Sequence, residues 1–205
     1  QIWQVKSEAP IVSSPVIKNG IVYIGGSDGC LRALDLQTGK IKWKYKGIDG
    51  YIETQPLIYD DKVIFGAWDN KLYAINCEDG SLAWKWKDGR AGILYSPAAC
   101  RPVASDGRIY IVAPDRVMSC IDATSGETIW RSKRDKVRES IGISEGNKMV
   151  FARCMWDTVF AIDATRQDFA YKWKKSYDYG FDIDPSYPVE ENGTIFFGTG
   201  YGNVY

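Results

Sequence analysis

The sequence contains no histidine among its 205 residues. This absence removes the commonest general base, every Ser-His or Cys-His nucleophile pair, and most zinc and copper sites. The phosphate-binding signature GxxxxGK[ST] is missing as well. Any chemistry in this chain would therefore depend on carboxylates, or on a cofactor held by backbone and carboxylate groups.

A surplus of charge is also missing. Lys plus Arg and Asp plus Glu number 26 each, so the formal net charge is zero, and nothing points to nucleic acid or an anionic membrane surface as a partner. No apolar run approaches the roughly 18 residues of a membrane span, so we expect no membrane insertion. The alternating lysines of residues 40–46 are typical of the solvated face of an outer strand.

Cysteine occurs five times, an odd number, and the sequence has neither a CxxC motif nor an adjacent Cys-Cys pair. The five are Cys30, Cys77, Cys100, Cys120 and Cys154. This usage favours reduced, structural thiols, with Cys120 as a buried small hydrophobic residue. It weakens the case for an oxidising compartment and keeps a cytoplasmic location open.

The most informative feature of the chain is a repeat. Four times an acidic or amide residue is followed eight positions later by Trp or Tyr, and the successive aromatic residues lie 41, 46 and 41 positions apart. Periods of about 40 residues are typical of propellers, solenoids and related arrays. The pairs are Asp35/Trp43, Asn76/Trp84, Asp122/Trp130 and Asp163/Tyr171.

Each repeat contains four short runs rich in Val, Ile, Leu, Tyr and Trp, separated by Gly, Asn, Asp and Ser. This pattern predicts a four-stranded antiparallel meander. Stacking such sheets radially buries both of their faces, so we predict an all-β fold, a β-propeller of four-stranded blades. The regular indole would then wedge between neighbouring blades, with its N–H bonded to a backbone carbonyl.

The segment Ala33-x-Asp35-x-x-Thr38-Gly39-Lys40-x-x-Trp43 resembles the tryptophan-docking motif of the PQQ-like, or quinoprotein-type, β-propeller repeat family. Residues 74–84 and 120–130 repeat it, and residues 161–171 form a degenerate copy without the glycine. The resemblance implies a structural docking role for the four pairs above. The family contains catalytic dehydrogenases, which hold PQQ and Ca²⁺ on the propeller axis, and a non-catalytic, BamB-like branch.

The repeats also predict how the chain is divided. We expect residues 1–205 to form a single propeller segment that belongs to a seven- or eight-bladed ring. Its predicted parts are the last strand of a preceding blade (1–6), four blades (10–46, 52–87, 93–133 and 139–175) and a partial blade (183–205).

Several charged residues fall near the predicted axis, which the first strand of each blade lines. Glu139 and Asp184 occupy the same phase of their repeats, and Glu53, Arg138 and Asp182 lie close by. These carboxylates are candidate ligands for a hard cation such as Ca²⁺. We favour a solvated ring of loop charges instead, and on that interpretation Glu139→Ala changes stability little.

Two tryptophans, Trp68 and Trp156, fall at predicted hairpin tips, where core packing does not require an aromatic ring. Together with Arg138 they are candidate contacts for a peptide or a sugar. A turn staple, in which the ring packs against its own hairpin, remains an equal alternative for both tryptophans.

Our leading hypothesis is a non-catalytic PQQ-like propeller that acts as a scaffold for a protein or glycan partner and needs no cofactor. We expect it in the bacterial cell envelope, in the periplasm or outside the cell, and the sequence leaves its oligomeric state open. A quinoprotein oxidoreductase with PQQ and Ca²⁺ on the axis is the alternative, although the adjacent cysteine pair of many such enzymes is missing. A sensor domain fused to an enzymatic module is a third possibility.

Overall fold

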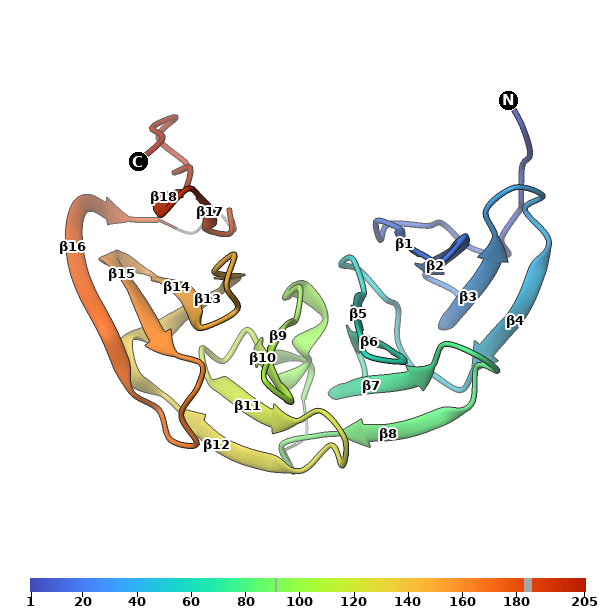
Figure 1. Ribbon diagram of the computed structural model, residues 1–205, viewed down its shortest axis with the longest axis horizontal. Helices are drawn as coiled ribbons and strands as arrows, with labels where there is room; N and C mark the ends of the chain where they lie inside the picture. The colour runs from blue at the N-terminus through green and yellow to red at the C-terminus, as the bar shows by residue number, and fades with distance from the viewer. Residues whose placement is uncertain (91, 183–185) are drawn as a thin grey trace. The chain divides into compact units, whose positions relative to one another are not determined.

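The computed structural model describes residues 1–90, 92–182 and 186–205, so the predicted site residue Asp184 lies outside the described residues. The strands of these residues form four four-stranded antiparallel sheets and one two-stranded sheet (Figure 1). Every four-stranded sheet is a meander, because each strand pairs with the next one along the chain. The chain divides into two compact units, Gln1–Arg101 and Pro102–Tyr205, and each is described by itself below.

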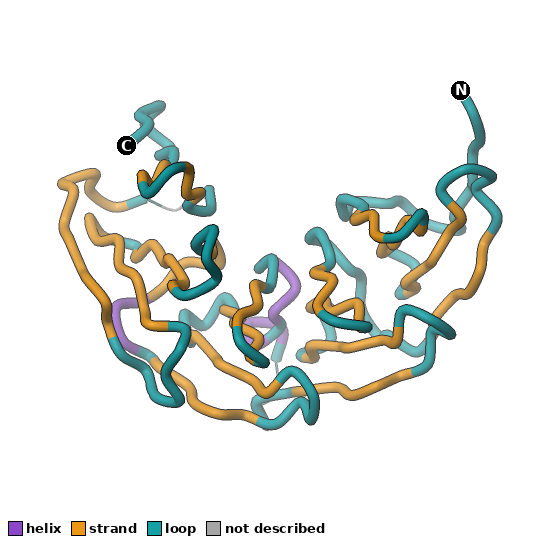
Figure 2. Tube along the Cα trace, viewed as in Figure 1, coloured by secondary structure: helices purple, strands orange, loops and turns teal. Residues whose placement is uncertain are grey.

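The first unit contains two of the four-stranded sheets. The first sheet consists of β1 (Val16–Lys18), β2 (Ile21–Gly25), β3 (Cys30–Asp35) and β4 (Ile41–Lys46). The second sheet consists of β5 (Leu57–Tyr59), β6 (Lys62–Ala67), β7 (Lys71–Asn76) and β8 (Leu82–Trp86). Two short helical turns follow, η1 (Ile93–Tyr95) and η2 (Pro97–Ala99), as Figure 2 shows.

The second unit contains the other two four-stranded sheets and the two-stranded sheet. The third sheet consists of β9 (Val103–Ser105), β10 (Arg108–Val112), β11 (Met118–Asp122) and β12 (Thr128–Ser132). The fourth sheet follows the helical turn η3 (Arg134–Lys136) and consists of β13 (Val137–Ile143), β14 (Met149–Cys154), β15 (Trp156–Asp163) and β16 (Tyr171–Phe181). The two-stranded sheet consists of β17 (Val189–Glu191) and β18 (Thr194–Phe196).

The core of the first unit lies between its two sheets. Tyr23 and Ala33 of the first sheet face Val63, Phe65 and Ile75 of the second, and all five are buried. Successive side chains of a strand point to opposite faces of its sheet, so the facing sides of the two sheets supply the residues of this core. The outer strand β4 instead carries exposed lysines, which discourage pairing of its free edge with another chain.

Trp43 joins the first sheet to the second, and Trp3 joins the N-terminal segment to the first sheet. The indole N–H of Trp43 donates to the backbone carbonyl of Cys77 at 2.9 Å, and its ring covers Gly80 so closely that a Cβ there would lie 2.6 Å from the ring. Trp3 does the same at Gly39. The φ angles are also positive, 70° at Gly39 and 74° at Gly80. Both the backbone conformation and the close approach of the indole therefore require glycine in these turns.

An acidic or amide residue four positions before each glycine helps to build the turn: Asp35 precedes Gly39, and Asn76 precedes Gly80. Asp35 Oδ1 accepts hydrogen bonds from the backbone N–H groups of Gln37 and Thr38, and Asp122 Oδ1 accepts them from Thr124 and Ser125. The Thr38 hydroxyl also donates to Asp35 and has the largest effect there, and these bonds favour the ionised form, so the pKa of both carboxyls lies below its usual value. The acid and the glycine four positions later thus form one capped turn, whereas the indole four positions after the glycine covers the turn of the next sheet, as Trp43 covers Gly80.

The fourth sheet departs from the sequence prediction. Ala33 pairs with Trp43, Ala74 with Trp84 and Cys120 with Trp130 across the last two strands of their sheets. In the fourth sheet Ala161 pairs with Trp173, so Trp173 occupies the equivalent position and the assignment of Tyr171 was wrong. The turn after Asp163 is two residues longer than in the other copies, and Tyr171 is 37% exposed and donates its hydroxyl to Asp135.

The longer turn also changes the contact that Trp130 makes. The backbone carbonyl that follows the turn acid, Ala164 in this copy, accepts hydrogen bonds from Arg108 Nη1 at 3.1 Å and from the Tyr110 hydroxyl at 3.3 Å. The Trp130 ring packs edge-on against Phe169 at 5.2 Å, and its buried Nε1 has no hydrogen-bond partner among the described residues. Arg108 therefore donates to the carbonyl at the position where, in the first unit, the Cys77 carbonyl accepts the indole N–H of Trp43.

All five cysteines are free thiols, and four of them are buried. Burial raises the pKa of Cys120 to about 12 and that of Cys154 to about 12. Since the thiolate is the reactive form, these two side chains behave as small core residues and not as nucleophiles.

The contrast between Trp43 and Trp130 predicts different costs for the same substitution. Trp43→Phe deletes a made hydrogen bond and leaves the Cys77 carbonyl without it, whereas Trp130→Phe removes an N–H that has no partner. We expect Trp43→Phe to lower the free energy of unfolding by about 1–3 kcal/mol more than Trp130→Phe does. Urea unfolding of both variants measures this difference, and equal losses would contradict the hydrogen-bond assignment.

Candidate functional site

The predicted charged residues of the second unit form a buried cluster. Glu139, on β13, is only 9% exposed, and its carboxylate bonds to Arg116 and lies 3.8 Å from Arg138. Burial lowers the pKa of Arg138, and the positive charges of Arg116 and Arg153 act in the same direction. The expectation that Glu139 belongs to a solvated ring of charges was therefore wrong. Its carboxylate is buried, because the turn between β10 and β11 of the third sheet brings Arg116 against it.

Asp182 is engaged in the same way by Arg153 of β14, which is 1% exposed. Arg153 Nη2 donates to Asp182 Oδ2 at 2.6 Å, and Nη1 donates to the Ser186 hydroxyl at 2.6 Å. Its guanidinium also lies 5.3 Å and 5.2 Å from the ring centroids of Tyr179 and Phe197. Arg153 therefore holds Asp182, Ser186 and Phe197 against the fourth sheet, which is a structural role.

In the first unit, Glu53 is held by one of the two predicted tip tryptophans. Trp68 Nε1 donates to Glu53 Oε2 at 2.6 Å, and the backbone N–H of Trp68 donates to the Tyr51 carbonyl at 3.2 Å. The rings of Trp68 and Tyr51 lie 5.8 Å apart. Trp68 is half-buried, and these contacts are with the segment between β4 and β5 and not with its own hairpin of β6 and β7.

These contacts test whether the candidate carboxylates fit a Ca²⁺ ion, which takes 6–8 oxygen ligands. Glu139 and Asp182 each bond to arginine, and Glu53 bonds to an indole. No group of three or more Cys, Asp or Glu side chains in the described parts of the chain is placed to hold a metal ion. The residues that the structure describes therefore do not fit the cation that a quinoprotein site requires.

Trp156 differs from Trp68. It is the first residue of β15, pairs with Phe181 across the sheet, and is 58% exposed. The rings of Trp156 and Phe181 lie 4.9 Å apart, and the Tyr201 hydroxyl donates to the Phe181 carbonyl at 3.1 Å. We call Trp156, Phe181 and Tyr201 the aromatic surface; Phe181 is 39% exposed and Tyr201 70%. The sequence indicated Trp156 alone, because Phe181 reaches it through strand pairing, and Tyr201 reaches the Phe181 backbone from a distant turn.

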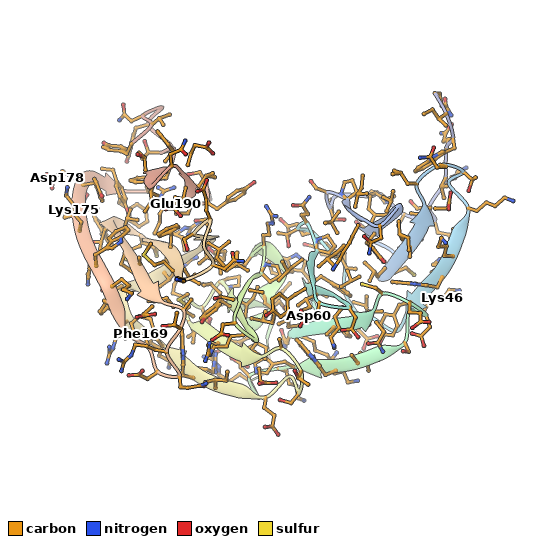
Figure 3. All side chains as sticks on the ribbon, viewed as in Figure 1. Lys46, Asp60, Phe169, Lys175, Asp178 and Glu190 are labelled. Carbon is orange, nitrogen blue, oxygen red and sulfur yellow. The ribbon has the colours of Figure 1, made fainter. Side chains whose placement is uncertain are left out.

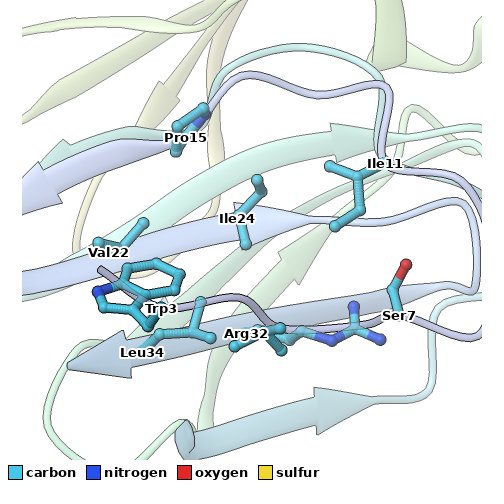
Figure 4. A pocket seen from close by; sticks show the side chains of 9 residues that line it. Trp3, Ser7, Ile11, Pro15, Val22, Ile24, Arg32 and Leu34 are labelled. Carbon is cyan, nitrogen blue, oxygen red and sulfur yellow. The ribbon is translucent and has the colours of Figure 1, made fainter. Parts of the chain in front are cut away.

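A separate apolar pocket of about 170 Å³ lies on the first sheet (Figure 4). Trp3 and Ile11 of the N-terminal segment line it together with Val22, Ile24 and Leu34 of the sheet. The guanidinium of Arg32, at its edge, already bonds to Asp28. With so few polar groups facing inward, the pocket has the character of a packing surface and not of a catalytic site.

A comparison with protein families matches residues 1–175 to the family described as outer membrane protein assembly factor BamB, a PQQ-like repeat family. The match covers most of the chain, so the chain belongs to this family. In the part of the chain that the structure describes, no helix is long and apolar enough to cross a membrane.

Solved structures of both branches of PQQ-like proteins share the fold. BamB from Moraxella catarrhalis aligns with a TM-score of 0.66 and 17% identity over 99% of this chain and 78% of its own. The quinohemoprotein alcohol dehydrogenase of Comamonas testosteroni gives 0.69 and 17% over 93% of this chain and 40% of its own. The enzyme ADHIIG of Pseudomonas putida HK5 gives 0.72 and 16% over 99% and 41%. At these identities the likeness shows the fold alone, and it confirms the predicted propeller class.

One curated relative matches a short stretch. The lanthanide-dependent methanol dehydrogenase of Methylacidiphilum fumariolicum (strain SolV) is 34% identical over 53 residues, which is 25% of this chain and 9% of that enzyme. The chain thus matches only a small part of that relative.

The buried cluster reverses the expected effect of Glu139→Ala. Removing this carboxylate leaves two arginines, Arg116 and Arg138, without their shared counter-charge, and a broken buried pair costs about 3–5 kcal/mol. The matched control is Glu127→Ala, which removes an exposed carboxylate and should stay within about 0.5 kcal/mol of the wild type. Chemical unfolding compares the two, and a silent Glu139→Ala would restore the solvated-ring interpretation.

The two tryptophans at predicted hairpin tips, Trp68 and Trp156, should also differ in their contribution to stability. Trp68→Ala removes a part-buried ring and a hydrogen bond to Glu53, so we expect a loss of at least about 2 kcal/mol. Trp156→Ala removes an exposed ring and should cost less than about 1 kcal/mol. Thermal and urea unfolding measure both, and a large loss for Trp156→Ala would show that this ring serves the fold.

Proposed function

We propose that this chain is a segment of a non-catalytic PQQ-like propeller that acts as a protein-binding scaffold in the cell envelope. The observation that carries the proposal is the state of the candidate cation ligands. Glu139, Asp182 and Glu53 each accept hydrogen bonds from donors of the chain itself; the donors are the half-buried Arg116, the buried Arg153 and the indole of Trp68. A carboxylate that neutralises a buried arginine cannot also coordinate Ca²⁺ without leaving that arginine uncompensated.

The family description supports the kind of partner and the location. Its name is that of an outer membrane protein assembly factor, which favours a protein partner over a glycan and a place in the bacterial envelope. The aromatic surface supplies a contact region, since exposed Trp and Tyr rings contribute most to binding energy at protein interfaces. Trp156 in particular has no described hydrogen bond from its indole that would bind it to its own sheet.

The quinoprotein oxidoreductase is the second candidate, because the 34% identity over 53 residues is to a methanol dehydrogenase. In that class the cofactor supplies the redox chemistry and the protein supplies binding and orientation. The arrangement of the described carboxylates disfavours this alternative.

A titration with pyrroloquinoline quinone separates the two candidates. We expect no saturable quenching of tryptophan fluorescence at micromolar quinone, with or without Ca²⁺, because the described carboxylates are already paired. A quinoprotein alcohol dehydrogenase freed of its cofactor serves as the positive control. Saturable quenching that depends on Ca²⁺ would overturn the scaffold proposal and favour the oxidoreductase.

A further inference from the structure

The neutral net charge of the chain conceals a local surplus of positive charge. Lys133, Arg134 and Lys136, at and around η3, are all exposed, and Lys174 of β16 lies beside them with its side chain 44% exposed. We call these four residues the basic turn. Asp135 is the one carboxylate described among them, so the basic turn has four cations against one anion.

The conformation of the turn is fixed by contacts with β16. Asp135 accepts hydrogen bonds from the Tyr171 hydroxyl and from Lys174 Nζ, and its side chain is only 14% exposed. The guanidinium of Arg134 lies 5.4 Å from the ring centroid of Phe169. Because Asp135 is turned inward to these partners, the cations and not the carboxylate are presented to solvent.

The basic turn meets the aromatic surface. The backbone N–H of Met155 donates to the carbonyl of Lys136 at 3.3 Å, and Trp156 is the next residue along the chain. An exposed indole supported by a second ring therefore adjoins a group of exposed cations on the same unit. Interfaces commonly combine an apolar aromatic anchor with a charged rim of this kind.

We propose that this combined surface binds an acidic, extended segment of a partner protein, with carboxylates on the basic turn and an apolar side chain against Trp156. The inference rests on the proposed scaffold function and names the chemistry of the partner. Charge complementarity selects an acidic segment, because a basic or neutral one would leave Lys133, Arg134 and Lys136 without a carboxylate partner, whereas Lys174 already pairs with Asp135. The ring cluster selects a segment that also carries an apolar anchor.

A membrane surface fits these observations less well. An anionic bilayer presents its charge evenly and would attract every lysine-rich face, including the exposed lysines of β4, where Lys46 projects from the strand (Figure 3). The basic turn differs from β4 in having an exposed indole beside it. That difference favours a discrete partner with both acidic and apolar groups.

The test uses three fluorescein-labelled peptides of equal length and fluorescence anisotropy. One alternates Glu with Leu, one alternates Glu with Ser, and one alternates Lys with Leu. We expect the Glu/Leu peptide to bind most tightly to the chain, with an affinity that falls as salt screens the charges. Lys133→Gln combined with Lys136→Gln should weaken it about fivefold. The matched control, Lys42→Gln combined with Lys46→Gln on β4, loses the same charge and should leave the affinity within about twofold.

Trp156→Ala should weaken binding of the Glu/Leu peptide and leave that of the Glu/Ser peptide unchanged. Equal losses in the two double variants, or tighter binding of the Lys/Leu peptide, would overturn the inference. So would binding to phosphatidylglycerol vesicles without binding to any peptide. If no peptide binds and the chain also does not bind quinone, only the proposal of an acidic partner is contradicted. If the chain binds quinone in a Ca²⁺-dependent way, the proposed scaffold function itself is contradicted.

Discussion

The structure depends on the contact between an indole and a glycine turn of the neighbouring sheet. A four-stranded meander has two apolar faces and cannot bury both alone, so it must pack between neighbours. Trp43 fills the space at the outer end of that packing, and its N–H finds the Cys77 carbonyl. The contact requires Gly80, since any Cβ would collide with the ring, and the turn that carries Gly80 is held in shape by hydrogen bonds of Ser81 with Asn76 and Asp79.

The second unit shows what happens when one part of this arrangement is lost. The turn after Asp163 has no glycine at the expected position and is two residues longer. Its carbonyl at Ala164 bonds to Arg108, and the Trp130 ring packs on Phe169 instead. The sheets still pack, but a buried guanidinium and ring-to-ring contact have replaced the indole hydrogen bond. A degenerate repeat can thus keep the geometry of the fold while its stabilising interactions change.

The repeat period was sufficient to predict the fold, because each sheet arises from local strand and turn signals. The position of Trp173 could not be read from it, since a two-residue insertion shifts the aromatic residue while Tyr171 happens to occupy the regular spacing. The burial of Glu139 was missed for a different reason. Its environment depends on Arg116, which is 23 residues away in sequence and reaches it only after two sheets have packed. Likewise, strand pairing brings Phe181 to Trp156, and a turn near the C-terminus brings Tyr201 to the Phe181 backbone.

The described candidate carboxylates are bound by groups of the protein itself. Glu139 and Asp182 form ion pairs with arginines, and Glu53 accepts a hydrogen bond from the indole of Trp68. Glu139 and Asp182 would each need to lose an arginine partner before they could attract a cation, and each loss would destabilise the fold. The free charge instead lies at the surface, at a turn whose single carboxylate points inward. Under the proposed scaffold function, this arrangement favours recognition of a partner by contact with the exposed charges.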